Sequence, residues 1–360
     1  MSAPQRKRLL TASVVAASFS LLLAGCGTTA PEAPAPAADT PAATDGPATA
    51  DCSPLTGKTI SLIVPYNTGG GYDVFARLIA PALGEALDAQ IIVENKPGAG
   101  GLLGIIGLTN EEPDGTHIAI MNGAGVAASI LGEAKGADFS FDDLSYIGRL
   151  GAENTIVAGA ASGEYQTWED VQNADGFRFG STGVGASDYV TPSILIEAFG
   201  LNAEIITGFA GQAEAALALL QGNIDGVTGP SDTRRVQIVA GDNIPLLSVT
   251  MDPPEDFAAA ATYVGELDLT EKQEMLLSSH IKVSELGRPL VAPAGMEPSM
   301  LECLREAFDT AAHDDEVLKQ ATAQNRPIAY IPGEEVETRI VEDIKNVPAE
   351  YLTVLRGAYK

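Results

Sequence analysis

Histidine, tryptophan and basic residues are all scarce in this chain of 360 residues. Its three His (His117, His280 and His313) are scattered, at no spacing that suits a metal ion, so the sequence predicts no metal site. Lys and Arg number 21 against 48 Asp and Glu, which gives a formal net charge of −27. This acidity argues against nucleic acid or anionic lipid as a partner. Any anionic ligand must therefore be held by local geometry, against the overall field.

Long hydrophobic runs are absent except near the N-terminus. Leu9–Leu23 follows the basic Arg6–Arg8 and has the length of a secretory signal rather than that of a membrane span. The run ends in Leu23-Ala24-Gly25-Cys26, which resembles the lipobox of bacterial lipoproteins. This resemblance implies that residues 1–25 are a signal peptide and that Cys26 carries a lipid, which anchors the protein to the outer face of the cell membrane. An ordinary cleaved signal with a chance Cys is the alternative.

Cysteine is scarce too, and the two thiols that remain after lipidation of Cys26 fit an oxidising compartment. Cys52 precedes the first expected strand, and Cys303 lies in a helix expected over 297–319. The sequence leaves open whether the two form a disulfide or whether one is a buried thiol and the other an exposed one. Residues 26–51 are almost entirely Ala, Pro, Thr, Gly and Asp, so we expect a flexible tether there.

Glycine is abundant, and much of it stands between expected strands and helices. Ile60–Val64 is an apolar, partly β-branched run typical of a buried strand, and an amphipathic helix begins near Asp73. Between them stand three consecutive Gly, 69–71, which form either a simple tight turn or, the favoured interpretation, an anion site made of backbone N–H groups before a helix dipole. Asp73 is either the N-cap of this helix or a ligand contact. The cap is favoured, since a carboxylate repels an anion.

The same order of elements recurs through the first half of the chain. Strands are expected at Gln90–Glu94 and His117–Met121, with a small-residue helix over Leu102–Thr109 between them. Such alternation predicts a largely parallel sheet whose ligand loops lie at the carboxyl ends of the strands. The loop 122–125, with Gly123, is one of these.

The second half of the chain repeats this logic. A strand at Phe177–Phe179 runs into the Gly-rich loop Gly180–Ser187, and a helix is expected over 188–199. A strand at Glu204–Thr207 and a helix with its apolar face over 213–220 follow. Two similar halves, each with glycine loops before helices, predict two lobes with a cleft between them.

Side chains of the second half add candidate donors to the backbone of its loops. Ser181, Thr182 and Ser187 carry hydroxyl groups in the loop before the helix, although Ser187 is as readily explained as a helix cap. Asp232 follows a short strand and is a further candidate for the cleft, whereas Asp225 is assigned to a turn.

The sequence lacks the motifs of two enzyme classes. Gly180-x-x-Gly-x-Gly has the wrong spacing for a dinucleotide-binding fingerprint, and the loop 122–125 lacks the third glycine. No G-x-S-x-G motif of a serine hydrolase is present. The sequence therefore predicts neither catalytic residues nor a cofactor.

Taken in order, the motifs resemble those of the substrate-binding proteins of tripartite tricarboxylate transporters, the TctC-like or Bug family. The family's Pro-Phe-x-Pro-Gly-Gly-x-x-Asp and Val-Glu-Asn-x-Pro-Gly-Ala-Gly-Gly motifs have counterparts here, as do its Pro-Asp-Gly turn, its second-lobe Gly-Ser loop, its Leu-x-x-Gly-x-Val-Asp segment and its return strand. The counterparts are Pro65–Asp73, Val93–Gly101, Pro113–Thr116, Gly180–Ser187, Leu219–Asp225 and Val291–Gly295. The resemblance covers about residues 55–250 and 290 onward.

This resemblance implies an α/β, two-lobed periplasmic-binding-protein (Venus flytrap) fold, with mixed, mostly parallel sheets flanked by helices and no enzymatic activity. Lobe 1 is expected to hold residues 52–155 and 286–360, and lobe 2 residues 156–285. The family binds small organic di- and tricarboxylates or acidic amino acids and passes them to membrane permease subunits. We expect a monomer. A binding protein that presents its solute to a membrane signalling partner is the alternative.

Carried over residue by residue, the resemblance also implies which groups bind the ligand. One carboxylate is expected to lie on the first Gly loop, with the second-lobe loop closing over the other end. The residues carried over are Tyr66, Gly70, Gly71, Asp73, Ser181, Thr182, Gly183 and Ser187. Tyr72, Gly123 and Asp232 are added to the expected ligand-binding residues from their places in the sequence.

The chain departs from the family pattern at three places. Asn67-Thr68 replaces the family's second Pro, and Tyr72 stands where a small Thr or Ser is common. A phenol at this position either narrows the pocket or adds a donor, which puts the ligand class in question. Residues 251–289 do not follow the family pattern, and the sequence places them neither inside nor outside the cleft.

Overall fold

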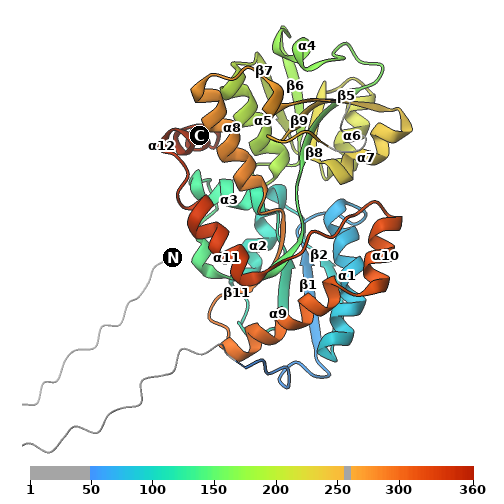
Figure 1. The fold of residues 1–360 in the computed structure, drawn as a ribbon, viewed down its shortest axis with the longest axis vertical. Helices are drawn as coiled ribbons and strands as arrows, with labels where there is room; N and C mark the ends of the chain where they lie inside the picture. The colour runs from blue at the N-terminus through green and yellow to red at the C-terminus, as the bar shows by residue number, and fades with distance from the viewer. Residues whose placement is uncertain (1–48, 255–260) are drawn as a thin grey trace, which may run out of the picture. The chain divides into compact units, whose positions relative to one another are not determined.

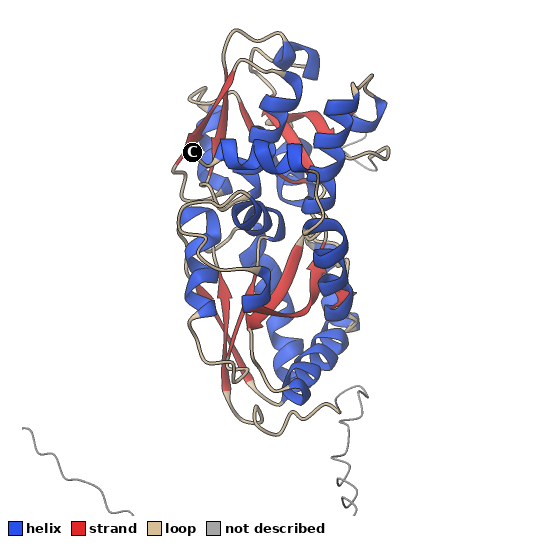
Figure 2. Ribbon diagram, turned by 90° about the vertical axis from the view of Figure 1, so that its left-hand side faces the viewer, coloured by secondary structure: helices blue, strands red, loops and turns tan. Residues whose placement is uncertain are grey.

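The computed structural model describes residues 49–254 and 261–360 (Figure 1). The expected signal peptide, Cys26 and all but the last residues of the expected tether lie outside the described residues. Two six-stranded sheets, each with helices packed against it, carry the fold (Figure 2). This confirms the expected class of two mixed α/β sheets flanked by helices. The expectation that the sheets are mostly parallel was wrong, because five of the ten pairings among the described strands are antiparallel.

The first sheet is parallel on one side and antiparallel on the other. Strands β2, β1 and β3 are parallel neighbours, whereas β11 runs antiparallel to both β3 and β4, and β12 antiparallel to β4. The order across the sheet is β12 (Ile331–Pro332), β4 (Leu144–Gly151), β11 (Arg288–Pro293), β3 (His117–Ile120), β1 (Thr59–Val64) and β2 (Gln90–Asn95).

The second sheet has the same mixed character. Strand β6 is parallel to β7 and β8, β5 is antiparallel to β8 and β9, and β10 pairs in parallel with β9. Its order is β10 (Thr262–Tyr263), β9 (Asn243–Val249), β5 (Thr155–Ala160), β8 (Gly226–Pro230), β6 (Phe177–Ser181) and β7 (Ala203–Thr207).

Helices cover the faces of both sheets, which buries central strands such as β1 and β5 almost completely. On the first sheet lie α1 (Gly71–Leu87), α2 (Leu102–Thr109), α9 (Pro298–Ala312) and α11 (Gly333–Arg339), and α10 (Asp315–Ala323) packs on α1 and α9. Helix α3 (Gly123–Leu131) follows β3 but packs on helices that accompany the second sheet. With the second sheet lie α4 (Trp168–Gln172), α5 (Ser187–Phe199), α6 (Gln212–Leu220), α7 (Ser231–Ala240), α8 (Glu271–Ser284) and α12 (Ala349–Ala358). None of the helices found in 49–254 and 261–360 is both long and apolar enough to cross a membrane.

We call the parts built around the first and second sheets lobe 1 and lobe 2. The chain crosses from one to the other at 152–154, between β4 and β5, and returns at 285–287, between α8 and β11. Helix α12 packs on α5 and α8 (Figure 1), although the sequence grouped all of 286–360 with lobe 1. A third crossing, between the π-helical turn η5 (Ile340–Ile344) and α12, carries the C-terminus to lobe 2.

Two local expectations were wrong, each because a polar side chain starts a helix. The helix expected over 297–319 is two helices, α9 and α10, because the Asp314 carboxylate accepts from the N–H groups of Glu316 and Val317, both at 3.0 Å. The expected loop 122–125 is the first turn of α3, capped by Asn122, whose Oδ1 accepts from Gly125 N at 2.8 Å.

Cys52 and Cys303 form a disulfide across a sequence separation of 251 residues. Replacing both with Ala is expected to lower the free energy of unfolding by about 2–5 kcal/mol, since the bond restricts a very long loop of the unfolded chain. Urea denaturation measures the change. The unsubstituted protein in excess dithiothreitol should shift to the same midpoint, and an unchanged midpoint in the double variant would contradict the expectation.

Candidate functional site

A cavity of about 340 Å³ lies where loops from both lobes meet. Lobe 1 contributes the segment after β1 and the cap of α3, and lobe 2 contributes the segments after β6, β7 and β8. The lining residues are Tyr66, Asn67, Thr68, Gly69, Gly70, Gly71, Tyr72, Asn122, Thr182, Ala186, Ser187, Ala210, Gly211, Gln212, Ala213, Glu214, Pro230 and Thr233.

Helices α1, α5 and α6 begin at the wall of this cavity, and none of the three has a side-chain cap. Their N-caps are Gly70 for α1, Ala186 for α5 and Gly211 for α6, and none of these makes a side-chain cap hydrogen bond. The N–H groups of a first helical turn have no partner within the helix, and the helix dipole gives that end partial positive charge. The cavity is therefore equipped to bind an anion.

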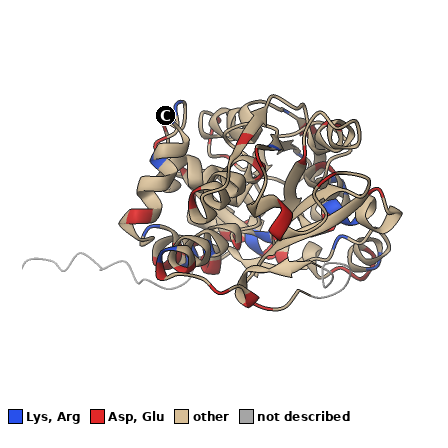
Figure 3. Cartoon of the chain, turned by 90° about the horizontal axis from the view of Figure 1, so that it is seen from above, with Lys and Arg blue, Asp and Glu red and all other residues tan. Residues whose placement is uncertain are grey.

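No Lys or Arg is among the described residues that line the cavity. Across the folded part, basic positions are scattered among acidic ones rather than gathered (Figure 3). Positive potential at the site thus comes from backbone groups, which agrees with the requirement that this acidic chain hold an anion by local geometry.

Asp73 supports the first Gly loop from behind instead of lining the cavity. It is the third residue of α1 and is buried, and its carboxylate accepts from Gly69 N at 2.8 Å and from Asn95 Nδ2 at 3.0 Å. It also pairs with Arg77 at 2.8 Å. Although burial raises the pKa of Asp73, the hydrogen bonds from these three partners outweigh it and hold the pKa below its ordinary value. It is neither N-cap nor lining residue.

The two lining tyrosines direct their hydroxyl groups at protein acceptors. Tyr66 OH donates to Gly100 O at 2.7 Å and accepts from Asn122 Nδ2 at 2.8 Å. Tyr72 OH donates to the buried carboxylate of Glu153, in the 152–154 crossing. The two rings lie 4.7 Å apart between centroids. Tyr72 therefore adds bulk to the cavity wall and offers no free hydrogen-bond donor.

The hydroxyl groups of the second-lobe loop converge on Asp188, a residue that the sequence did not single out. Asp188 Oδ1 accepts from Ser181 Oγ at 2.8 Å, from Thr182 N at 3.0 Å and from Thr182 Oγ1 at 3.1 Å, while Gln212 Nε2 donates to Oδ2. Gly183 N in turn donates to Ser181 Oγ at 3.1 Å. These groups hold the loop in shape and do not face the cavity as free donors.

The expected site residues thus divide into two sets. Tyr66, Gly70, Gly71, Tyr72, Thr182 and Ser187 line the cavity, whereas Asp73, Gly123, Ser181, Gly183 and Asp232 do not. Gly123 instead packs on the second crossing, with its N–H donating to Gly287 O at 2.9 Å. The segment 210–214 was missed, although the overlapping Gly208-x-x-Gly211 sequence before helix α6 carries the same signal as the Gly loops before α1 and α5.

Asp232 belongs to a buried ion-pair cluster beside the cavity. Its Oδ1 lies 3.0 Å from Arg288 Nη2 and 3.4 Å from Arg326 Nη1, and Arg288 Nε lies 3.9 Å from Glu153 Oε1. The Arg288 guanidinium also lies over the ring of Phe75 at 4.6 Å. This cluster joins α7 of lobe 2 to β11 of lobe 1.

Asp188 predicts a pH dependence of stability. Burial raises its pKa to about 6, despite the hydrogen bonds it accepts, so the folded protein binds more protons than the unfolded chain between about pH 4 and 6. The contribution of Asp188 to stability is therefore expected to fall as pH rises through that window, by up to ~3 kcal/mol at ~1.4 kcal/mol per pKa unit. Asp188→Asn should make the change of stability with pH less negative in urea denaturation from pH 4 to 7. The same change of stability with pH in both proteins would contradict this effect of Asp188.

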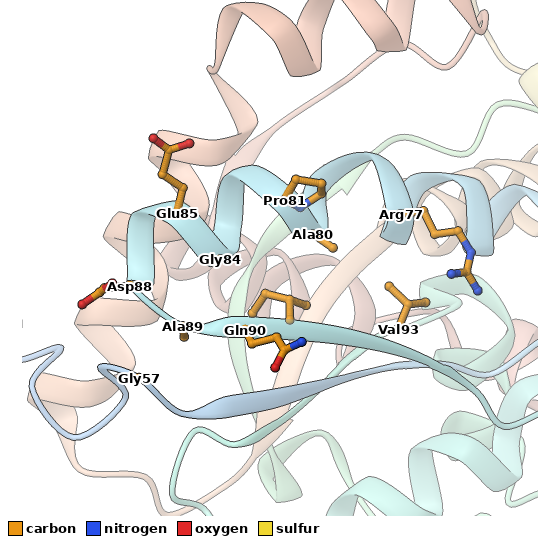
Figure 4. Close-up of a pocket in the computed structure, with 11 residues that line it drawn as sticks. Gly57, Arg77, Ala80, Pro81, Gly84, Glu85, Asp88, Ala89, Gln90 and Val93 are labelled. Carbon is orange, nitrogen blue, oxygen red and sulfur yellow. The ribbon is translucent and has the colours of Figure 1, made fainter.

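Other features are less suited to a ligand. An open hollow of about 820 Å³ lies between α1 and β2 on lobe 1 (Figure 4), where the C-terminal end of α1 and the carboxylates of Glu85 and Asp88 disfavour an anion. Within the described ranges, no group of three or more His, Cys, Asp or Glu is arranged to hold a metal ion.

Comparisons with known proteins agree with this fold. Periplasmic binding protein BugD superposes with a TM-score of 0.68 at 19% identity, covering 84% of this chain and 97% of that one. MatC from Rhodopseudomonas palustris with bound malate (TM-score 0.66, 17% identity, 84% and 99% covered) and an R. palustris protein with adipate (0.67, 15%, 83% and 97%) are also similar.

Sequence comparison identifies the family directly. A UPF0065 protein in the TAR-I ttuE-ttuC' intergenic region of Agrobacterium vitis is 27% identical over 278 residues, which are 75% of this chain and 76% of that protein. The family model described as "Tripartite tricarboxylate transporter family receptor" matches residues 75–345, which is most of the chain. The chain belongs to the tripartite tricarboxylate transporter receptor family of periplasmic solute-binding proteins.

Proposed function

We propose that this protein captures a small organic carboxylate in the cavity between its lobes and delivers it to the permease of a tripartite tricarboxylate-type transporter. The observation that carries the proposal is the meeting of three uncapped helix N-termini, from both lobes, around one cavity. A ligand that engages α1 of lobe 1 together with α5 and α6 of lobe 2 stabilises the closed form, and the permease distinguishes that form from the open one.

The magnitudes fit this role. Hydrogen bonds to a charged group contribute ~1.5–3 kcal/mol each. Four or five of them, less the cost of ordering the closed form, reach the ~8 kcal/mol of a micromolar site. The bound malate and adipate of the two R. palustris neighbours have the size and charge that we propose for this ligand.

The remaining parts of the proposal concern location. We place the folded part at the outer face of the cell membrane, held by a lipid on Cys26 and spaced from it by the tether 26–51. Mass spectrometry of the mature protein tests the anchor: a diacylglyceryl-modified Cys26 as the first residue supports it, and a free N-terminus elsewhere contradicts it.

A thermal-shift screen tests the function. The protein is unfolded and refolded to remove bound ligand, then heated with succinate, malate, citrate, aspartate, adipate and their methyl esters. We expect a saturable rise in melting temperature with at least one free acid and none with its ester. No response to any acid would refute carboxylate capture.

A further inference from the structure

A second hollow, of about 430 Å³, adjoins the cavity, and we call it the outer pocket. The two spaces share four lining residues, Tyr66, Asn67, Thr182 and Ala210. The outer pocket is also lined by 97–101 of lobe 1 and by 208–210 of lobe 2. Like the cavity, it therefore lies between loops of both lobes.

One hydrogen bond runs along the boundary between the two spaces. Asn67, in the segment after β1, donates from Nδ2 to Ala210 O at 2.8 Å, and both residues line both spaces. Both are also exposed, so the Asn67 side chain exchanges this bond for bonds to water at small net cost. Ala210 directly precedes Gly211, the N-cap of α6. A ligand bound at the start of α6 therefore lies beside the boundary and reaches the outer pocket once Asn67 turns aside.

Apolar side chains dominate the outer pocket. No Asp, Glu, Lys or Arg is among its lining residues in the described part of the chain. Hydrogen-bond acceptors are present, on Asn67 and on the glycine backbone, but the pocket is open to solvent, so water can bond to them. An apolar group therefore gains contact with the wall without depriving these acceptors of water. The apolar lining side chains are those of Pro65, Tyr66, Pro97 and Phe209.

The start of helix α2 also borders the outer pocket, but its first N–H groups are already used. Gly101 is the N-cap of α2 and lines the pocket. The N–H groups of Gly101 and Leu103 both donate to Gly98 O, at 2.9 and 3.4 Å, and that of Leu102 donates to Ala99 O. The outer pocket therefore suits an uncharged group rather than a second carboxylate.

We infer that the ligand is a dicarboxylate with an apolar branch, which places its carboxylates at the helix starts of the cavity and its branch past Asn67 in the outer pocket. The inference rests on the proposed function and narrows its substrate class. Because the helix starts of both lobes engage the charged ends, the part that enters the outer pocket is an alkyl or aryl branch on the carbon chain. Each methylene group that the pocket removes from water raises the affinity by about fourfold.

Calorimetric titration of the refolded full chain tests the inference. The matched ligands are succinate, methylsuccinate and benzylsuccinate, which share the same diacid and differ only in the branch. Both enantiomers of the branched acids are measured, because the outer pocket adjoins the cavity on one side. We expect the better enantiomer of benzylsuccinate to bind at least about tenfold more tightly than succinate. A smaller gain for both enantiomers overturns the inference and leaves carboxylate capture intact. Failure of all of these acids, and of adipate, overturns carboxylate capture itself.

A substitution in the outer pocket tests where the branch lies. Phe209→Ala is expected to lower the benzylsuccinate-to-succinate affinity ratio by about tenfold, because it removes an aromatic ring from the wall. Phe199→Ala is the matched control and should leave the ratio unchanged. It removes another partly buried ring of lobe 2, which packs on Trp168 and lines neither space. An unchanged ratio in Phe209→Ala refutes the placement of the branch in the outer pocket.

A second variant keeps this placement testable if Phe209→Ala does not fold. Asn67→Ala changes an exposed side chain and removes the group that the branch has to displace. We therefore expect the benzylsuccinate-to-succinate affinity ratio to rise about threefold or more. A ratio that stays the same or falls contradicts passage of the branch past Asn67.

Discussion

Gly125→Ala will weaken carboxylate binding by about 100-fold or more, because one methyl group at this position forces α3 away from the start of α5 at the cavity wall. Gly125 lies in the first turn of α3, and a Cβ there would stand 2.2 Å from Gly185 O and 2.8 Å from the Ala186 backbone at the start of α5. Real Cβ atoms do not approach backbone this closely, so α3 and the start of α5 cannot pack as they do without displacement of one of them. A 100-fold loss corresponds to about 2.7 kcal/mol of binding free energy.

Calorimetry with the best-binding acid measures this loss, and small-angle scattering reports whether the ligand still closes the protein. Gly107→Ala is the matched control: it adds the same methyl group in the helix α2, where a Cβ meets nothing within 4 Å. The control should bind as the unsubstituted protein does. Normal affinity in Gly125→Ala would show that the contact between α3 and the start of α5 is not needed for binding.

Arg288→Met is expected to destabilise the protein by about 3–5 kcal/mol, since it leaves buried carboxylates without their cation. Arg288 has 1% of its side chain exposed and pairs with Asp232 at 3.0 Å, and its Nη1 also donates to Ala152 O at 2.9 Å. Met keeps much of the volume against Phe75 and removes the charge. The loss should appear as a lower urea midpoint.

Two controls distinguish the loss of a buried ion pair from a general effect of removing a positive charge. Arg356→Met breaks the exposed pair with Glu133, at 2.8 Å, and should cost less than about 1 kcal/mol. Arg288→Met in an Asp232→Asn background should cost less than in the parent, because one of the stranded carboxylates is already gone. Equal costs in both backgrounds would contradict the coupling of Arg288 to Asp232.

The order and bounds of the elements were largely predictable because their signals are local. The helix expected over Leu102–Thr109 has those bounds in the structure, and the strands expected at Ile60–Val64 and Gln90–Glu94 are each one residue longer. Apolar runs, and the glycines that end them, determine such elements from a few neighbouring residues of the sequence. The start of helix α1 directly after the first Gly loop was likewise predictable, since loop and helix are adjacent in sequence.

The direction of side chains at the site was not predictable, because it depends on partners far along the chain or on burial. Ser181 and Thr182 turn inward because the buried Asp188 needs donors, and nothing in the loop sequence distinguishes this from donation to a ligand. Tyr72 meets Glu153, 81 residues later, only when α1 and the 152–154 crossing pack together. Asp232 was expected in the cleft and instead meets Arg288, 56 residues later.

A crystal structure of the protein with the tightest-binding diacid tests whether the helix starts hold the ligand. We expect one diacid in the cavity, with carboxylate oxygens about 2.7–3.2 Å from backbone nitrogens in the first turns of α1 and of α5 or α6, and with no Lys or Arg side chain in contact. A diacid held by basic side chains, or bound in the hollow between α1 and β2, would contradict it.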